Sequence, residues 1–191
     1  AELRQQARFL VTIGACATSG GIQALRNWGD HDAIRAAVYA QPEFVASLAT
    51  STPIADHVAV DAELRGCPID PRQLVELLTA LTTGRRPQLR DEAVCMECKR
   101  GGNACVMVTR HVPCLGQVTQ AGCGAICPRF GRGCYGCFGP REQANVKGLV
   151  EFLQTHARMS PTDIGRLFAG FSANAEPFRG LVGQYGGAPP K

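Results

Sequence analysis

Eight of the ten cysteines of this 191-residue chain lie in one stretch, where their spacing suits metal binding. The pattern reads Cys95-x2-Cys98-x6-Cys105-x8-Cys114-x8-Cys123-x3-Cys127-x6-Cys134-x2-Cys137. Eight thiols divide into two sets of four, and four is the number of thiolates that one [4Fe–4S] cluster needs. Thiolates are soft donors that suit the iron corners of a cubane. The spacing therefore favours two iron–sulfur clusters.

The residues between these cysteines lack the periodicity of helices or strands. Glycine, proline and cysteine recur every few positions between Cys95 and Pro140, so few apolar side chains are left to form a core. Ligand bonds to clusters would hold such a segment together. Glycines beside the cysteines would let backbone amides approach sulfur and tune a cluster's potential.

Two other uses of the thiols are open from spacing alone. Cys95-x2-Cys98 and Cys134-x2-Cys137 are each typical of zinc knuckles, and two four-cysteine zinc sites would use all eight thiols. Disulfides are a further alternative, which a reducing compartment disfavours. A zinc-stapled interaction module is therefore the competing interpretation from a different functional class.

Several segments resemble the small subunit of [NiFe] hydrogenases, in particular the cytoplasmic, NAD(P)-linked type that includes the sulfhydrogenase delta subunit. The matching segments are residues 95–105, 113–116, 121–128 and 132–140, with 13–27 and 65–70 upstream. The resemblance covers nearly the whole chain. It implies an α/β fold, with a partial flavodoxin-like parallel-sheet domain over residues 1–90. An irregular iron–sulfur domain with C-terminal helices would follow over residues 91–191.

The resemblance also implies how the eight thiols divide. The first cysteine set, which would bind the distal cluster, is Cys95, Cys98, Cys105 and Cys114. The second cysteine set, which would bind the medial cluster, is Cys123, Cys127, Cys134 and Cys137. Many uptake hydrogenases have proline where Cys127 stands and carry a three-iron cluster. A fourth thiolate here implies [4Fe–4S] at both sites.

Cys16 and Cys67 match the third and fourth ligands of the family's proximal cluster. The family supplies the first two ligands from a Cys-x-x-Cys near its N-terminus, and no such motif precedes Cys16 in this sequence. The chain is therefore expected to lack the family's N-terminal portion. A third [4Fe–4S] cluster is expected only if a missing segment supplies two further cysteines.

The function that the resemblance implies is electron relay within a hydrogenase, with no catalytic residue in this chain. The nickel–iron site would lie on a large subunit, and electrons would reach a ferredoxin-like subunit and then a flavin- and NAD(P)-binding subunit. A related alternative is a hydrogenase that serves a deazaflavin or heterodisulfide system. The similar subunit of respiratory complex I is disfavoured, because it holds one cluster and lacks the eight-cysteine stretch.

Regular elements are expected on both sides of the cysteine-rich stretch. Residues 9–13 predict a buried parallel strand, residues 56–60 the end of another strand, and residues 22–28 a helix. Asp70, Pro71 and Gln73 predict a capped helix start, followed by Leu74, Leu77, Leu78 and Leu81 on one buried face. Helices are also expected from about Asn145 and from Ser160, whereas the tail after Gly180 is expected to be loose or to lie across a partner.

Composition excludes several other functions. A net charge of +4 with scattered basic residues gives no footprint for nucleic acid, and no apolar run is long enough to span a membrane. The N-terminus lacks the pattern of a signal peptide, so a cytoplasmic location is expected. The loop from Gly14 to Gly21 lacks the spacing of a P-loop or a dinucleotide-binding turn, so nucleotide binding is disfavoured.

Overall fold

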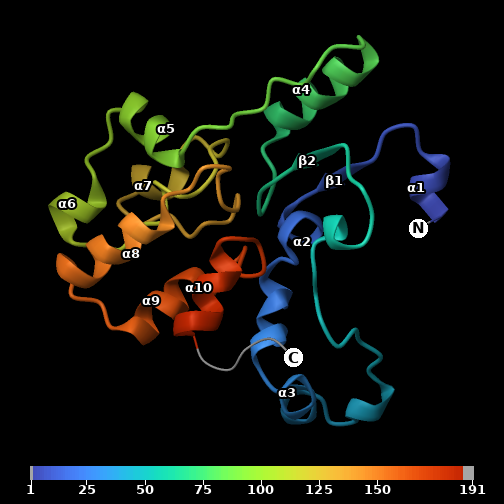
Figure 1. The fold of residues 1–191 in the computed structure, drawn as a ribbon, viewed down its shortest axis with the longest axis horizontal. Helices are drawn as coiled ribbons and strands as arrows, with labels where there is room; N and C mark the ends of the chain where they lie inside the picture. Colours follow the sequence, from blue (N-terminus) through green and yellow to red (C-terminus); the bar gives the residue numbers. More distant parts are fainter. Residues whose placement is uncertain (1, 187–191) are drawn as a thin grey trace.

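The computed structural model describes residues 2–186, so residue 1 and residues 187–191, at the outer ends of the two expected domains, lie outside the described part. The fold is a mixed α/β fold that consists mostly of helices and contains one short pair of parallel strands (Figure 1). The elements in chain order are α1 (Glu2–Gln6), β1 (Val11–Ile13), α2 (Ala15–Ser19), η1 (Ile22–Trp28), α3 (His31–Val38), η2 (Pro42–Phe44), η3 (Ile54–Asp56), β2 (Ala62–Leu64), α4 (Pro71–Thr82), α5 (Val94–Arg100), α6 (Val106–Arg110), α7 (Ile126–Arg129), α8 (Val146–Thr155), α9 (Pro161–Phe168) and α10 (Phe178–Tyr185).

The strand pair joins two segments that are far apart in the sequence. β1 runs parallel to β2, with Val11 opposite Ala62 and Ile13 opposite Leu64. The first predicted strand is confirmed over residues 11–13, whereas the second begins after residues 56–60, where it was expected. The reason is local: residues 54–56 form a 3-10 turn, and the His57 N–H donates to the carbonyl oxygen of Ile54 at 3.0 Å. The chain therefore becomes extended only after this turn is complete.

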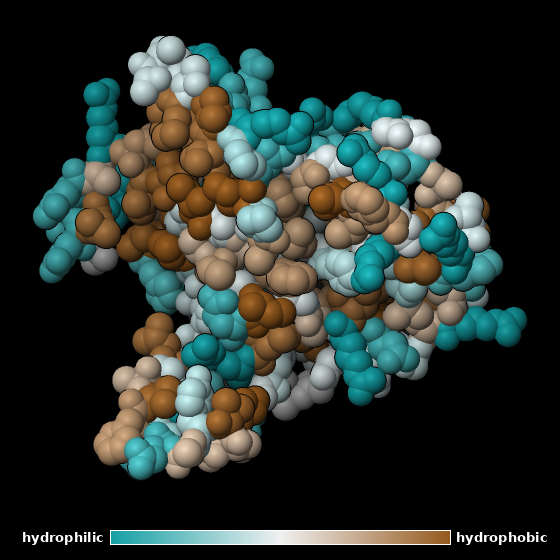
Figure 2. Space-filling view, turned by 180° about the vertical axis from the view of Figure 1, so that it is seen from behind, coloured by the Kyte–Doolittle hydropathy of each residue, from teal (hydrophilic) through white to brown (hydrophobic). Residues whose placement is uncertain are grey.

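α4 begins as the sequence predicts but buries less of its surface. The Asp70 carboxylate caps it by accepting the Arg72 N–H at 2.8 Å. The expected contribution of Gln73 to a capping box is wrong, because no hydrogen bond joins its side-chain oxygen to the Asp70 backbone N–H. Leu77 is buried, but Leu78 is 53% exposed. Figure 2 shows apolar side chains gathered on the face of the molecule below the C-terminal end of α4.

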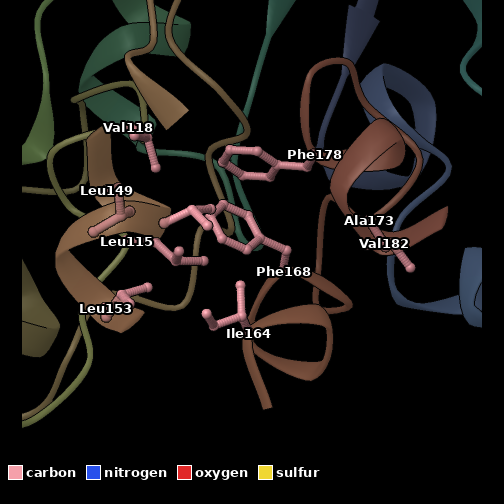
Figure 3. Close-up of a cluster of buried hydrophobic side chains, with 10 residues drawn as sticks. Leu115, Val118, Leu149, Leu153, Ile164, Phe168, Ala173, Phe178 and Val182 are labelled. Atoms are coloured by element: carbon pink, nitrogen blue, oxygen red, sulfur yellow. The ribbon is translucent and has the colours of Figure 1, made fainter. Parts of the chain in front are cut away.

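The main hydrophobic core lies among the three C-terminal helices and the segment that follows Cys114. Phe168 and Phe178 meet edge to face, with their ring centroids 5.1 Å apart (Figure 3). The remaining buried members of this core are Leu115, Val118, Leu149, Val150, Leu153, Ile164, Ala173 and Val182. The predicted helices after Asn145 and Ser160 are both confirmed, and each of these residues caps its helix.

The end of the described chain is more regular than expected. Residues 178–185 form α10, which packs closely on α9, so the expectation of a loose tail from Gly180 is wrong up to Tyr185. Phe178 and Val182 are both buried in the main core, and this burial stabilises the helix despite its glycines. Among residues 2–186, no helix is both long and apolar enough to cross a membrane.

Candidate metal centre

The first cysteine set gathers around Gly116. Cys95 and Cys98 lie one turn apart on α5, and the Cys95 N–H donates to the Gly116 carbonyl oxygen at 3.2 Å. A Cβ built on Gly116 would lie 3.3 Å from Cys114 Sγ and 3.6 Å from Cys95 Sγ. If ionised, any of the three other members, Cys105 included, would raise the pKa of the Cys95 thiol, so all three lie near it. The structure thus brings the four residues of this set into one neighbourhood.

The second cysteine set surrounds the turn that begins α7. The backbone N–H groups of Ala125 and Ile126 point at the sulfur of Cys123. Cys127 lies on α7 itself, and ionised Cys123 or Cys127 would raise the pKa of the Cys137 thiol, as would ionised Cys67. Ionised Cys137 would in turn raise the pKa of Cys134. The four residues of this set therefore lie near one another, and Cys67 also lies near Cys137.

The two sets meet where Cys114 of the first lies beside Cys134 of the second. The Cys134 N–H donates to Cys114 Sγ at 3.1 Å, and the Leu115 N–H donates to the Cys134 carbonyl oxygen at 3.1 Å. A Cβ at Gly133 would lie only 1.9 Å from the Pro113 carbonyl oxygen. The two backbone segments can therefore approach this closely only because residue 133 has no side chain.

Burial disfavours the charged form of most of these thiols. It raises the pKa of Cys95 to about 11, with smaller contributions from the neighbouring cysteines, and it also raises the pKa of Cys137 to about 11. Burial likewise raises the pKa of Cys98, Cys114, Cys123 and Cys134. Because only the thiolate binds metal, binding here would have to release protons.

The donor set fits an iron–sulfur cluster in its chemistry. The Gly116 N–H donates to Cys114 Sγ at 3.4 Å, and the Gly136 N–H donates to Cys134 Sγ at 3.4 Å. Amides directed at sulfur are the groups that stabilise and tune thiolate ligands. Within residues 2–186, no three His, Cys, Asp or Glu side chains converge on a point that could hold a single metal ion. A cubane offers four separate iron corners, so its ligands need not converge in that way.

Cys16 lies in the first turn of α2, and Cys67 lies in the turn that follows β2. The Ala15 N–H donates to the Gly66 carbonyl oxygen at 2.9 Å, so the residues that precede the two cysteines are in contact. Both cysteines are exposed. Cys67 lines a hollow of about 480 Å³ together with Cys123 and Cys137 of the second set. The structure therefore places Cys67 at the border between the strand pair and the second cysteine set.

Sequence reasoning overlooked Glu97, which lies between Cys95 and Cys98 on α5. Its side chain is only 8% exposed, and its carboxylate accepts the Gly124 N–H at 3.1 Å. Glu97 therefore joins the helix of the first set to the turn of the second. Its position within the Cys-x-x-Cys segment was the available signal, but that segment alone does not say which way the side chain points.

The first part of the chain is similar to a described protein family. Residues 1–81 match the family described as NADH ubiquinone oxidoreductase, 20 Kd subunit. The matched region contains β1, β2, Cys16 and Cys67, and it ends before the eight-cysteine stretch begins.

The relatives that match most of the chain are hydrogenase subunits. Sulfhydrogenase 2 subunit delta of Pyrococcus furiosus is 37% identical over 153 residues, which cover 80% of this chain and 64% of the relative. A subunit of the F420-non-reducing hydrogenase of Methanocaldococcus jannaschii is 30% identical over 172 residues, covering 75% of this chain and 59% of the relative. The chain thus spans about three fifths of their length. The resemblance to hydrogenase subunits predicted from the cysteine motifs is confirmed.

A solved structure, described as the crystal structure of NAD+-reducing [NiFe]-hydrogenase in the H2-reduced state, also matches. It is 32% identical, and the match covers 45% of this chain and 56% of that one with a TM-score of 0.40.

Proposed function

We propose that this chain is the electron-transfer small subunit of a [NiFe] hydrogenase, which relays electrons between a nickel–iron site on a large subunit and an NAD(P)-reducing module. The observation that carries the proposal is the gathering of eight thiols into two neighbouring groups of four, in a relative of hydrogenase subunits. The match to the 20 Kd subunit family ends at residue 81, so that family alone does not account for the eight thiols.

In this proposal, the first and second cysteine sets each bind one [4Fe–4S] cluster, and Cys16 and Cys67 contribute to a third, proximal one if further cysteines complete it. When bound, such a cluster supplies one-electron redox chemistry. The chain's own residues supply the rest: thiolates hold the iron, and amides such as that of Gly116 donate to sulfur. Burial of Cys114 and Cys134 keeps water away from the border between the sets.

The proposed architecture follows the same division. The parallel pairing of β1 and β2 supports a partial flavodoxin-like layer within residues 1–90, and residues 91–191 would form the iron–sulfur part with its helical support. We place the complex in the cytoplasm, with a large subunit, a ferredoxin-like subunit and a flavin- and NAD(P)-binding subunit as partners. The chain itself holds no bond-making site in this scheme.

A second carrier system is a specific alternative. The relative from Methanocaldococcus jannaschii is named as part of an F420-non-reducing hydrogenase. Another relative, the gamma chain of coenzyme F420 hydrogenase from Methanococcus voltae, is 37% identical over 98 residues, or 51% of this chain and 35% of the relative. A hydrogenase that serves a deazaflavin or heterodisulfide system is therefore the alternative within the same class. Reduction of NAD(P) and of a deazaflavin by the purified complex, with hydrogen as donor, would separate the two.

Metal analysis of the oxygen-protected native complex tests the proposal. We expect iron and acid-labile sulfide that exceed those of the other cluster-bearing subunits by at least two four-iron clusters per copy of this chain. About two zinc ions per copy of this chain, with no iron or sulfide beyond that of the other subunits, would refute the proposal and support a zinc-stapled interaction module instead.

A further inference from the structure

Glu97 connects the two cysteine sets through one hydrogen bond. It lies on α5 between two members of the first set, yet its carboxylate accepts the backbone N–H of Gly124, the residue that follows Cys123 of the second set, at 3.1 Å. Its side chain is 8% exposed, whereas that of the neighbouring Glu92 is 24% exposed. A buried carboxylate is costly unless it makes such bonds, so its position is specific.

The carboxylate of Glu97 is held at the second set. Its Oε2 lies 3.1 Å from the backbone N of Gly124, and Gly124 directly follows the proposed ligand Cys123. Arg90 partly balances the carboxylate, with its Nε at 3.7 Å, and Arg72 and Arg100 also interact with it.

We propose that Glu97 is a positioning residue that holds the Cys123–Gly124 turn against α5 and lowers the reduction potential of a cluster bound by the second set relative to one bound by the first. The inference rests on the proposed function, since it presumes clusters at both sets. Reduction adds one electron, and hence one negative charge, to the cluster. A fixed carboxylate beside one of its ligands opposes that added charge.

Substitutions at Glu97 separate its charge from its hydrogen bond. Glu97→Gln keeps an oxygen that can accept the Gly124 N–H but removes the charge, and Glu97→Asp keeps the charge on a shorter side chain. Glu92→Gln is the matched control, because Glu92 also pairs with Arg90 and Arg100 but does not contact the turn at Gly124. Arg90→Gln removes a cation near Glu97 and should act in the opposite direction.

The test is a redox titration of the native complex, followed by electron paramagnetic resonance. The second-set signal is the one that Cys127→Pro alters. Glu97→Gln should raise the reduced-to-oxidised ratio of the second-set cluster roughly tenfold at a fixed ambient potential. For a one-electron couple, this is a rise of about 59 mV in the reduction potential of that cluster. Arg90→Gln should lower that ratio. Glu97→Asp should keep the ratio at its wild-type value, and Glu92→Gln should change it by less than about twofold from wild type.

The outcomes separate this inference from the function on which it rests. Wild-type complex without iron and sulfide in this chain would overturn both. Two clusters whose potentials are the same in wild type and Glu97→Gln would overturn the role of Glu97 and leave the relay intact. An equal shift of both clusters, or equal shifts from Glu97→Gln and Glu92→Gln, would also refute it, because the proposed effect is specific to one residue and one set.

Discussion

The close approach of the Gly133 backbone to that of Pro113 can be tested by adding one methyl group at residue 133. Gly133→Ala would place a Cβ 1.9 Å from the Pro113 carbonyl oxygen and 3.4 Å from Cys114 Cα. Ordinary contact begins at 3.4 Å, so the two segments must separate by about 1.5 Å. The atoms in the way belong to the backbone, so a rotamer change cannot relieve the overlap.

The cost follows from the contacts that this separation breaks. The Cys134 N–H would leave Cys114 Sγ, and the Leu115 N–H would leave the Cys134 carbonyl oxygen. Each bond contributes about 0.5–1.5 kcal/mol, and inserting the methyl group adds about 1–3 kcal/mol, so the free energy of unfolding should fall by about 2–6 kcal/mol. At about 2–4 °C per kcal/mol for a chain of this size, the midpoint of thermal unfolding should fall by about 4 °C or more.

The assay combines thermal unfolding with iron and sulfide content after anaerobic isolation. Because Cys114 and Cys134 come from different sets, Gly133→Ala should reduce the iron at both. Gly183→Ala is the control, since a Cβ there meets nothing within 4 Å and the residue lies inside α10. It should be neutral or stabilising by up to about 1 kcal/mol. Unchanged iron content and an unchanged midpoint in Gly133→Ala would show that the two segments are not packed as described.

Three further predictions concern single ligands and one ion pair. Cys127→Pro should convert the second-set cluster to a three-iron form, and an unchanged four-iron signal in electron paramagnetic resonance would refute that ligand role. Cys98→Ala should lose first-set iron and block carrier reduction but keep proton–deuterium exchange at the large subunit; loss of both activities would indicate misfolding instead. The Arg85 guanidinium and the Gln88 N–H lower the pKa of Glu76 from 4.5 to about 2. The bonds to the ionised Glu76 carboxylate therefore stabilise the folded state fully above about pH 4.5, and this stabilisation is lost as the pH falls towards 2. Thermal unfolding of Glu76→Gln should accordingly differ from wild type at about pH 6 and converge with it near pH 2, and a constant difference would contradict the assignment.

Local signals in the sequence were enough to predict the helices that carry little chemistry. Asp70 and Pro71 mark the start of α4, and Ser160 marks that of α9, because capping depends on neighbouring residues alone. The burial of α4 could not be predicted in the same way. Leu78 continues the apolar repeat after Leu77, but about half of its surface stays exposed. Periodicity shows that a helix has an apolar stripe and does not show how much of the stripe is covered.

The family resemblance implied how the eight cysteines divide into two sets, but neither it nor the cysteine spacing could predict how the two sets are joined. The position of β2 depended on the turn that ends at His57, and the role of Glu97 depended on the direction of one side chain. The turn is a local feature that the apolar pattern of residues 56–60 does not show, whereas the direction of the Glu97 side chain is a tertiary feature. The contact between Cys114 and Cys134 is of the same kind, since 20 residues separate the partners in the chain.

The contacts between the cysteine sets imply that they assemble as one unit. Cys134 of the second set donates its N–H to the sulfur of Cys114 in the first, while Glu97 on the helix of the first set accepts the Gly124 N–H of the second. The two bonds connect the sets at separate points. A change that moves one set must therefore strain the other, because burial leaves little room for independent adjustment. For a chain proposed to pass electrons from one cluster to the next, such coupling would keep the spacing between the clusters fixed.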